Sequence, residues 1–147
     1  MAEIKHRIGI AGSAADVYEL LSSDAGLSKW WTTDTSGAGD VGSIIEFRFG
    51  EGGPDFEVTE LIPGRLVRWR HSGEMPTQWM GSEILFELSE DGKQTILNFS
   101  HYNWQQSDEF LAHCSTKWAV FMMSIKSCIE TGRGKPFPDD VQIDFDE

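Results

Sequence analysis

Residues 107–132 carry the sequence SDEFLAHCSTKWAVFMMSIKSCIETG, in which apolar side chains recur at steps of three and four residues. This spacing places them on one face of an α-helix. Asp108 and Glu109 favour a helix start because carboxylates stabilise the positive end of the helix dipole, and Gly132 favours a stop. The pattern therefore predicts a long helix from about Ser107 to Thr131. Its apolar stripe consists of Phe110, Cys114, Trp118, Phe121, Ile125, Cys128 and Ile129.

Upstream of this helix the apolar residues alternate with a period of two. Ile45, Phe47 and Phe49 are separated by Glu46 and Arg48, which predicts a strand with one apolar face and one solvated face. Regular strand–turn–strand repeats predict an antiparallel meander, whose apolar face the long helix covers. Further strands are predicted at residues 56–62, 66–70, 83–88 and 95–102, with turns at Pro63-Gly64 and Asp91-Gly92.

The N-terminal part of the chain predicts one strand followed by two short helices. The strand spans Glu3 to Ala11, Ser13 is placed to cap a helix over residues 14–22, and a second helical piece ends at Trp31. The predicted fold class is α+β, with a curved antiparallel sheet wrapped around the long C-terminal helix. We expect one domain over residues 1–138 and an acidic C-terminal tail over residues 139–147.

The charge, apolar content and cysteines of the chain indicate which partners and which location to expect. The 147 residues carry 24 acidic and 12 basic side chains, a net charge of -12, so phosphate backbones are repelled and no nucleic-acid partner is expected. No apolar run approaches the roughly 18 residues of a membrane span, so no membrane insertion is expected. Cys114 and Cys128 lie about 21 Å apart along the predicted helix and cannot form a disulfide with each other. Without an apolar leader, the predicted location is cytoplasmic.

Three stretches of the chain resemble a known superfamily. They are IAGSAADVYELL at 10–21 with KWW at 29–31, FEV at 56–58 with PGRLVRW at 63–69, and KW at 117–118 with IKSCIETG at 125–132. Together they resemble the helix-grip superfamily of START-type lipid-transfer domains and birch-pollen-allergen-like proteins. Within it, they are similar to the branch of activators of heat-shock-protein ATPase. The resemblance covers residues 3–138.

The resemblance implies a sheet that grips a helix, with a cavity between them that admits an apolar or aromatic small molecule in many members. Its matching residues are mostly packing and turn positions, so they indicate the fold more than an activity. The predicted function is therefore binding of such a molecule. Histidine spacing suggests no metal site, and no cofactor motif is present. The candidate ligand-binding residues are Phe47, Phe49, Trp69, Phe86, Phe99, His101, Trp118, Phe121 and Met122.

His101 has two interpretations. Strand alternation turns it to the same side as Leu97 and Phe99, where it could orient a ligand or transfer a proton. The favoured interpretation is a partly buried histidine that is satisfied by a backbone or side-chain partner. The first interpretation keeps open an enzyme of the polyketide cyclase or aromatase kind.

A further alternative is a protein-interaction module. It would act as a homodimer or with a chaperone partner, through an exposed aromatic patch around Trp30, Trp31 or Trp79. Such a module predicts a large apolar surface that is open to solvent.

Overall fold

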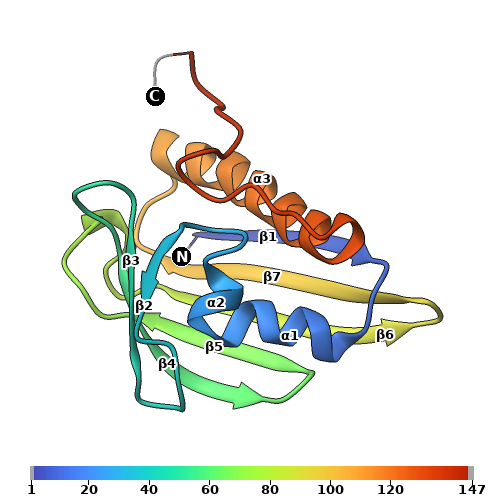
Figure 1. Ribbon diagram of the computed structural model, residues 1–147. Coiled ribbons are helices and arrows are strands. Elements are labelled where there is room, and N and C mark those ends of the chain that lie inside the picture. The colour runs from blue at the N-terminus through green and yellow to red at the C-terminus, as the bar shows by residue number, and fades with distance from the viewer. Residues whose placement is uncertain (1, 146–147) are drawn as a thin grey trace.

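The computed structural model describes residues 2–145 as one seven-stranded antiparallel sheet with three helices (Figure 1). The strand order is β1-β7-β6-β5-β4-β3-β2, so strands β2 to β7 form a meander and β1 closes one edge by pairing with β7. In chain order the elements are β1 (Ala2–Ile10), α1 (Ala14–Ser22), α2 (Asp24–Leu27), β2 (Asp34–Ser36), β3 (Ile44–Arg48), β4 (Asp55–Ile62), β5 (Leu66–His71), a 3-10 turn (Thr77–Trp79), β6 (Glu83–Asp91), β7 (Gln94–Trp104) and α3 (Glu109–Thr131).

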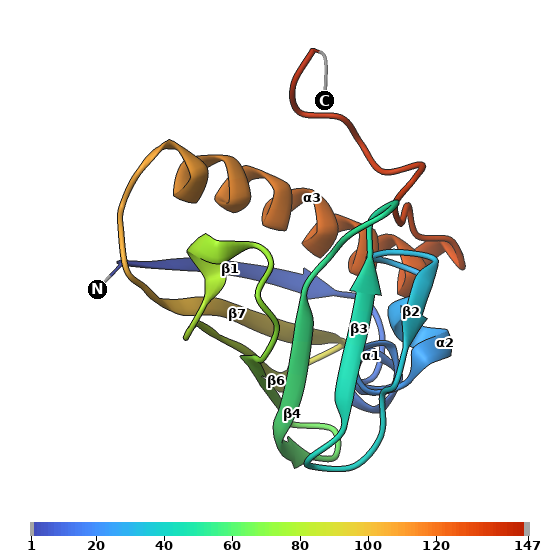
Figure 2. The same cartoon turned by 90° about the vertical axis from the view of Figure 1, so that its left-hand side faces the viewer.

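The sheet is strongly bent. Figure 2 shows β1 and β7 running beneath α3, whereas β2, β3 and β4 stand at a steep angle to them. Helices α1 and α2 lie across the face of the sheet, where α1 contacts β5, β6 and α3 (Figure 1). The α+β fold with a long C-terminal helix and short helices after the first strand is confirmed.

Helix α3 begins at Glu109, two residues later than predicted. The backbone of Asp108 is extended, with φ -133° and ψ -171°, and its side chain accepts a hydrogen bond from the backbone N–H of Leu111 at 3.2 Å. Asp108 is therefore the N-cap and lies outside the first turn. At the other end Gly132 has φ +84°, a left-handed conformation that glycine adopts without steric cost.

The C-terminal half of α3 is tied to the edge strand β1. Lys126 Nζ donates to the carbonyl of Gly9 at 2.5 Å, and Glu130 accepts from the backbone N–H of Ala11 at 2.9 Å. These two bonds fix one end of the helix over the sheet. The N-terminal half of α3 contributes several side chains to the candidate site.

Strand alternation holds along β7, where Leu97, Phe99 and His101 are all buried under the helix.

Two elements were not predicted. Strand β2 has three residues, too few to show a period, and the turn at Thr77–Trp79 follows Pro76 in a segment without alternation. The prediction of an exposed aromatic patch around Trp30, Trp31 or Trp79 is wrong. Trp30 is 0% exposed, Trp31 is 2% exposed and Trp79 is 8% exposed.

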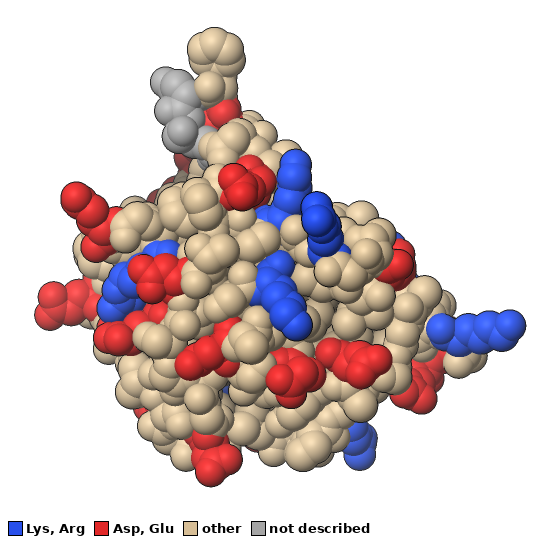
Figure 3. All heavy atoms as spheres, in the orientation of Figure 1, with Lys and Arg blue, Asp and Glu red and all other residues tan. Residues whose placement is uncertain are grey.

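The surface of the molecule is mixed but predominantly acidic. On the face drawn in Figure 3, carboxylate side chains are spread around the outline with basic side chains between them. This distribution agrees with the net charge of -12. Among the described residues, no helix combines the length and apolar character needed to cross a membrane.

Candidate functional site

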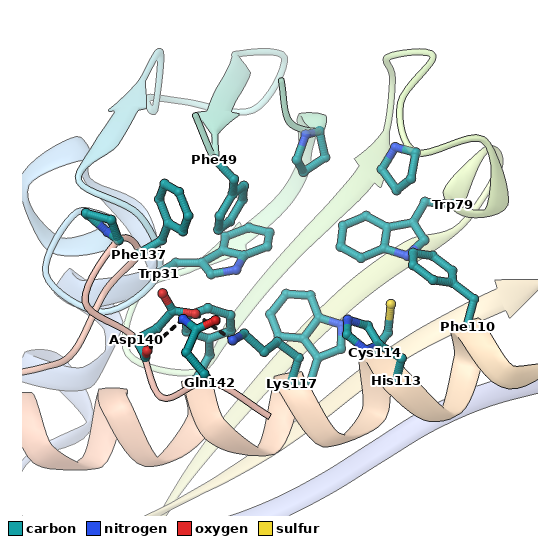
Figure 4. Close-up of a pocket in the computed structure, with 15 residues that line it drawn as sticks. Trp31, Phe49, Trp79, Phe110, His113, Cys114, Lys117, Phe137, Asp140 and Gln142 are labelled. Carbon is teal, nitrogen blue, oxygen red and sulfur yellow. Dashed lines mark hydrogen bonds and ion pairs between the residues drawn. The ribbon is translucent and has the colours of Figure 1, made fainter. Parts of the chain in front are cut away.

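A pocket of about 570 Å³ lies where the N-terminal half of α3 faces the bent end of the sheet (Figure 4). Four other segments complete its walls: the loop between α2 and β2, the β3–β4 connection, the turn after β5 and the chain beyond α3. The lining residues are Trp31, Phe49, Pro54, Pro76, Trp79, Phe110, His113, Cys114, Lys117, Trp118, Phe121, Phe137, Pro138, Asp140 and Gln142.

Trp31 is the centre of the aromatic wall. Its ring centroid lies 4.9 Å from that of Trp118 on α3 and 4.3 Å from that of Phe47 on β3. It also lies 5.5 Å from Phe49 and 6.4 Å from Phe121, and only 2% of Trp31 is exposed. One side chain therefore joins the helix, the bent sheet and the pocket, and tilted or edge-to-face ring pairs of this kind contribute beyond their buried area.

The segment after α3 forms one side of the pocket. The backbone N–H of Phe137 donates to the carbonyl of Trp31 at 2.8 Å, and that of Thr33 donates to the carbonyl of Phe137 at 3.2 Å. The Phe137 ring lies 5.3 Å from that of Phe49. This strand-like pairing fixes residues 137–142 against the edge of the sheet. The residues predicted as an acidic tail thus contribute Asp140 and Gln142 to the lining, whereas Asp146 and Glu147 lie outside the described residues.

Polar groups gather at one end of this wall. Lys117 Nζ lies 2.6 Å from Asp140 Oδ2 and donates to the carbonyl of Val141 at 2.8 Å. The Asp140 side chain is only 3% exposed, and Gln142 donates to its backbone carbonyl at 3.2 Å. On the outer rim His113 pairs with Asp144 at 3.2 Å. The pocket is therefore aromatic over most of its wall and carries a buried ion pair on one side (Figure 4).

His101 lies behind the pocket, not in its lining. The indole N–H of Trp118 can only donate, so His101 Nδ1, at 3.2 Å, accepts from it. His101 Nε2 therefore carries the proton and donates to Ser82 Oγ at 2.8 Å, and Ser82 in turn donates to the carbonyl of Trp79 at 2.6 Å. This chain of bonds connects two pocket tryptophans, one on α3 and one in the turn after β5.

Burial keeps the His101 ring neutral. Desolvation, with a smaller contribution from the charge of His71, lowers the pKa of His101 to about 3. Both ring nitrogens have partners and the residue is 0% exposed. The geometry therefore agrees with the interpretation of a satisfied, buried histidine.

Cys114 contributes a thiol to the pocket lining. Burial raises the pKa of the Cys114 thiol to about 12, so it stays protonated near neutral pH and lacks the thiolate that nucleophilic chemistry requires. Within residues 2–145, no cluster of three or more histidine, cysteine or carboxylate side chains is arranged to hold a metal ion.

Of the nine residues predicted to bind a ligand, three line the pocket and six lie in the core. Phe49, Trp118 and Phe121 line the pocket. The other six fill the core next to it and are at most 1% exposed: Phe47, Trp69, Phe86, Phe99, His101 and Met122. The sequence did not indicate two residues of the pocket: Trp31 was considered only for the exposed patch of the protein-interaction alternative, and Asp140 was assigned to the tail. The adjacent pair Trp30-Trp31 was a usable signal for a buried aromatic, but no period in the sequence marks Asp140 or Lys117 as pocket residues.

Comparison with known proteins identifies the family. Residues 11–130 match the model of the family described as Activator of Hsp90 ATPase homolog 1-like protein. The Aha1 dimer from Colwellia psychrerythraea is 54% identical, with a TM-score of 0.85, over 91% of this chain and 100% of that chain.

More distant structures share the fold. Protein SSP2350 from Staphylococcus saprophyticus is 15% identical, with a TM-score of 0.75 over 90% of this chain and 95% of its own. CalU16 from Micromonospora echinospora is 18% identical, with a TM-score of 0.72 over 87% and 74%. The comparison with curated proteins finds no match. The family model and the Colwellia structure together show that the chain belongs to the Activator of Hsp90 ATPase homolog 1-like family.

Proposed function

We propose that the protein binds a small apolar or aromatic molecule in the pocket between α3, the bent end of the sheet and residues 137–142. The observation that carries this proposal is a space of about 570 Å³ walled mainly by aromatic rings. Ligand sites in proteins typically have volumes of roughly 300–1,000 Å³ and combine apolar walls with a few polar groups. Trp31 and Trp118 provide flat surfaces for stacking, and the Lys117–Asp140 pair supplies the polar group.

Naphthalene is a suitable probe because it is flat, apolar and small enough for this volume. We expect it to bind with a dissociation constant of about 0.1 mM, a modest affinity for ten heavy atoms. The measurement is a nuclear magnetic resonance titration that follows the indole N–H signals of Trp31, Trp79 and Trp118, all of which line the pocket. Absence of any shift in these signals up to the solubility limit contradicts the proposal.

A filling variant tests the location of binding. Cys114→Phe places a ring in the wall of the pocket and is expected to weaken naphthalene binding at least tenfold, because the ring occupies space that the probe needs. The matched control is Met123→Phe on the same helix. Met123 is 54% exposed and does not line the pocket, so this variant is expected to bind naphthalene like the original protein. Equal affinities in the two variants would place the probe elsewhere.

The cyclase or aromatase alternative receives less support. It required a histidine in contact with the ligand, and His101 does not line the pocket and has both nitrogens engaged. A proton-transfer role would need another group.

A homodimer is the second candidate, because the 54% identical Colwellia protein is described as a dimer. We expect sedimentation equilibrium at micromolar concentration to give a mass of about 33 kDa, twice the 16.5 kDa of one chain. A concentration-independent mass of one chain would contradict this. A chaperone partner stays a prediction that rests on the description of the family.

A further inference from the structure

The Asp140 carboxylate is an unusual element of an aromatic wall. Its side chain is 3% exposed, and one oxygen, Oδ2, faces Lys117 Nζ at 2.6 Å. The other oxygen, Oδ1, is buried and has no hydrogen-bond partner within the described part of the chain. A buried oxygen without a donor costs free energy, because it has lost its hydrogen bonds to water and no protein donor replaces them. Asp140 Oδ1 can therefore accept a hydrogen bond from a ligand.

The charges around Asp140 select the kind of ligand group that fits. The ammonium of Lys117 already contacts the Asp140 carboxylate and the carbonyl of Val141. An incoming anion would compete with Asp140 for Lys117 and would also meet a protein with a net charge of -12. A hydroxyl or amino group, in contrast, can donate to Oδ1 without breaking the contact between Oδ2 and Lys117.

We infer that the pocket selects a neutral aromatic molecule that carries a hydroxyl or amino donor, and that this donor binds Asp140 Oδ1. The ring of the ligand then lies against Trp31, Phe121 and Phe137, which line the same pocket (Figure 4). This inference rests on the proposed function and adds the chemical class of the ligand to it. Because the carboxylate is charged and shielded from water, the hydrogen bond contributes more than one between neutral groups.

Four probes that share one ring system test the inference. Naphthalene measures the contribution of the aromatic wall, 2-naphthol adds a donor, 2-methoxynaphthalene keeps the oxygen without the donor, and 2-naphthoate replaces it with an anion. We expect 2-naphthol to bind about tenfold more tightly than 2-methoxynaphthalene, the size expected for one hydrogen bond to a charged acceptor. We expect 2-naphthoate to bind no more tightly than naphthalene. The titrations are run at neutral pH, where 2-naphthol is uncharged.

The variant Asp140→Asn should change this preference. Loss of the charge weakens the acceptor at this position, so the advantage of 2-naphthol over 2-methoxynaphthalene is expected to fall to about threefold or less. The matched control is Asp139→Asn, which removes the same charge from an exposed neighbour and should keep the original preference. Because the four-probe comparison in the original protein needs no variant, the inference remains testable if Asp140→Asn fails to fold.

The outcomes separate this inference from the proposed function. If none of the four probes binds, the ligand-binding proposal itself is overturned. If naphthalene binds but 2-naphthol binds no more tightly than 2-methoxynaphthalene, the pocket binds ligands and the role of Asp140 is overturned. Tightest binding of 2-naphthoate would also overturn it, because Lys117 would then be the selecting group.

Discussion

Replacement of Trp31 by alanine is expected to lower the free energy of unfolding by about 3–5 kcal/mol, the usual cost of removing a large aromatic side chain from a packed core. The Trp31 ring is 2% exposed and stacks at 6.2 Å from Trp69 in addition to its contacts with α3 and β3. Its loss opens a cavity where three parts of the fold meet. Urea denaturation followed by circular dichroism measures the change.

The control for this variant is Phe49→Ala in the same pocket. Phe49 is only partly buried, and its ring contacts Trp31 at 5.5 Å and Phe137 at 5.3 Å. We expect it to cost less than half as much. If the two variants cost the same, Trp31 does not have the central structural role that its contacts indicate.

The second large effect is a loss of stability in mild acid that depends on His101. The pKa of His101 in the folded protein is about 3, below the value of about 6.5 for an unfolded histidine. Its contribution is therefore fully present above pH 6.5 and is lost as the pH falls toward 3, because the unfolded chain takes up a proton that the folded chain cannot accept. Between pH 7 and pH 5 this single residue is expected to remove about 2 kcal/mol of stability.

The variant His101→Gln isolates this contribution. It should lower stability at pH 7 by about 1–3 kcal/mol, because the bonds to Ser82 and Trp118 are disturbed. The further loss between pH 7 and pH 5 should nevertheless be smaller than in the original protein by about 2 kcal/mol. An unchanged pH dependence in His101→Gln would show that the ring can be protonated in the folded state.

Much of the fold can be predicted from the sequence because its signals are periodic. The three- and four-residue spacing from Phe110 to Ile129 defines α3, and the alternation of Ile45 and Phe47 defines the buried face of β3. Both patterns arise because one side of each element must be buried. Strand β2 and the turn at Thr77–Trp79 have no such pattern, since they are too short to show one.

The pocket was harder to predict, for a physical reason. Alternation shows that Phe47 and Trp69 point into the interior, but it does not show whether they meet other rings or empty space. In the structure Phe47 and Trp69 pack against Trp31, and the pocket lies beside the N-terminal half of α3. Its position depends on the path of residues 137–142, which have no regular secondary structure. Asp140 was therefore predicted to be part of a tail, although its side chain is buried against Lys117.

The pairing of Phe137 with Trp31 has a consequence for the order in which the protein is made. Synthesis proceeds from the N-terminus, so the strands and α3 leave the ribosome before residues 137–142 do. A nascent chain that has reached only Gly132 can already bury most of its core, but it lacks Phe137, Pro138, Asp140 and Gln142 on one side of the pocket. The pocket therefore gains this side only after these residues have left the ribosome, later than the strands and α3 that form its other sides.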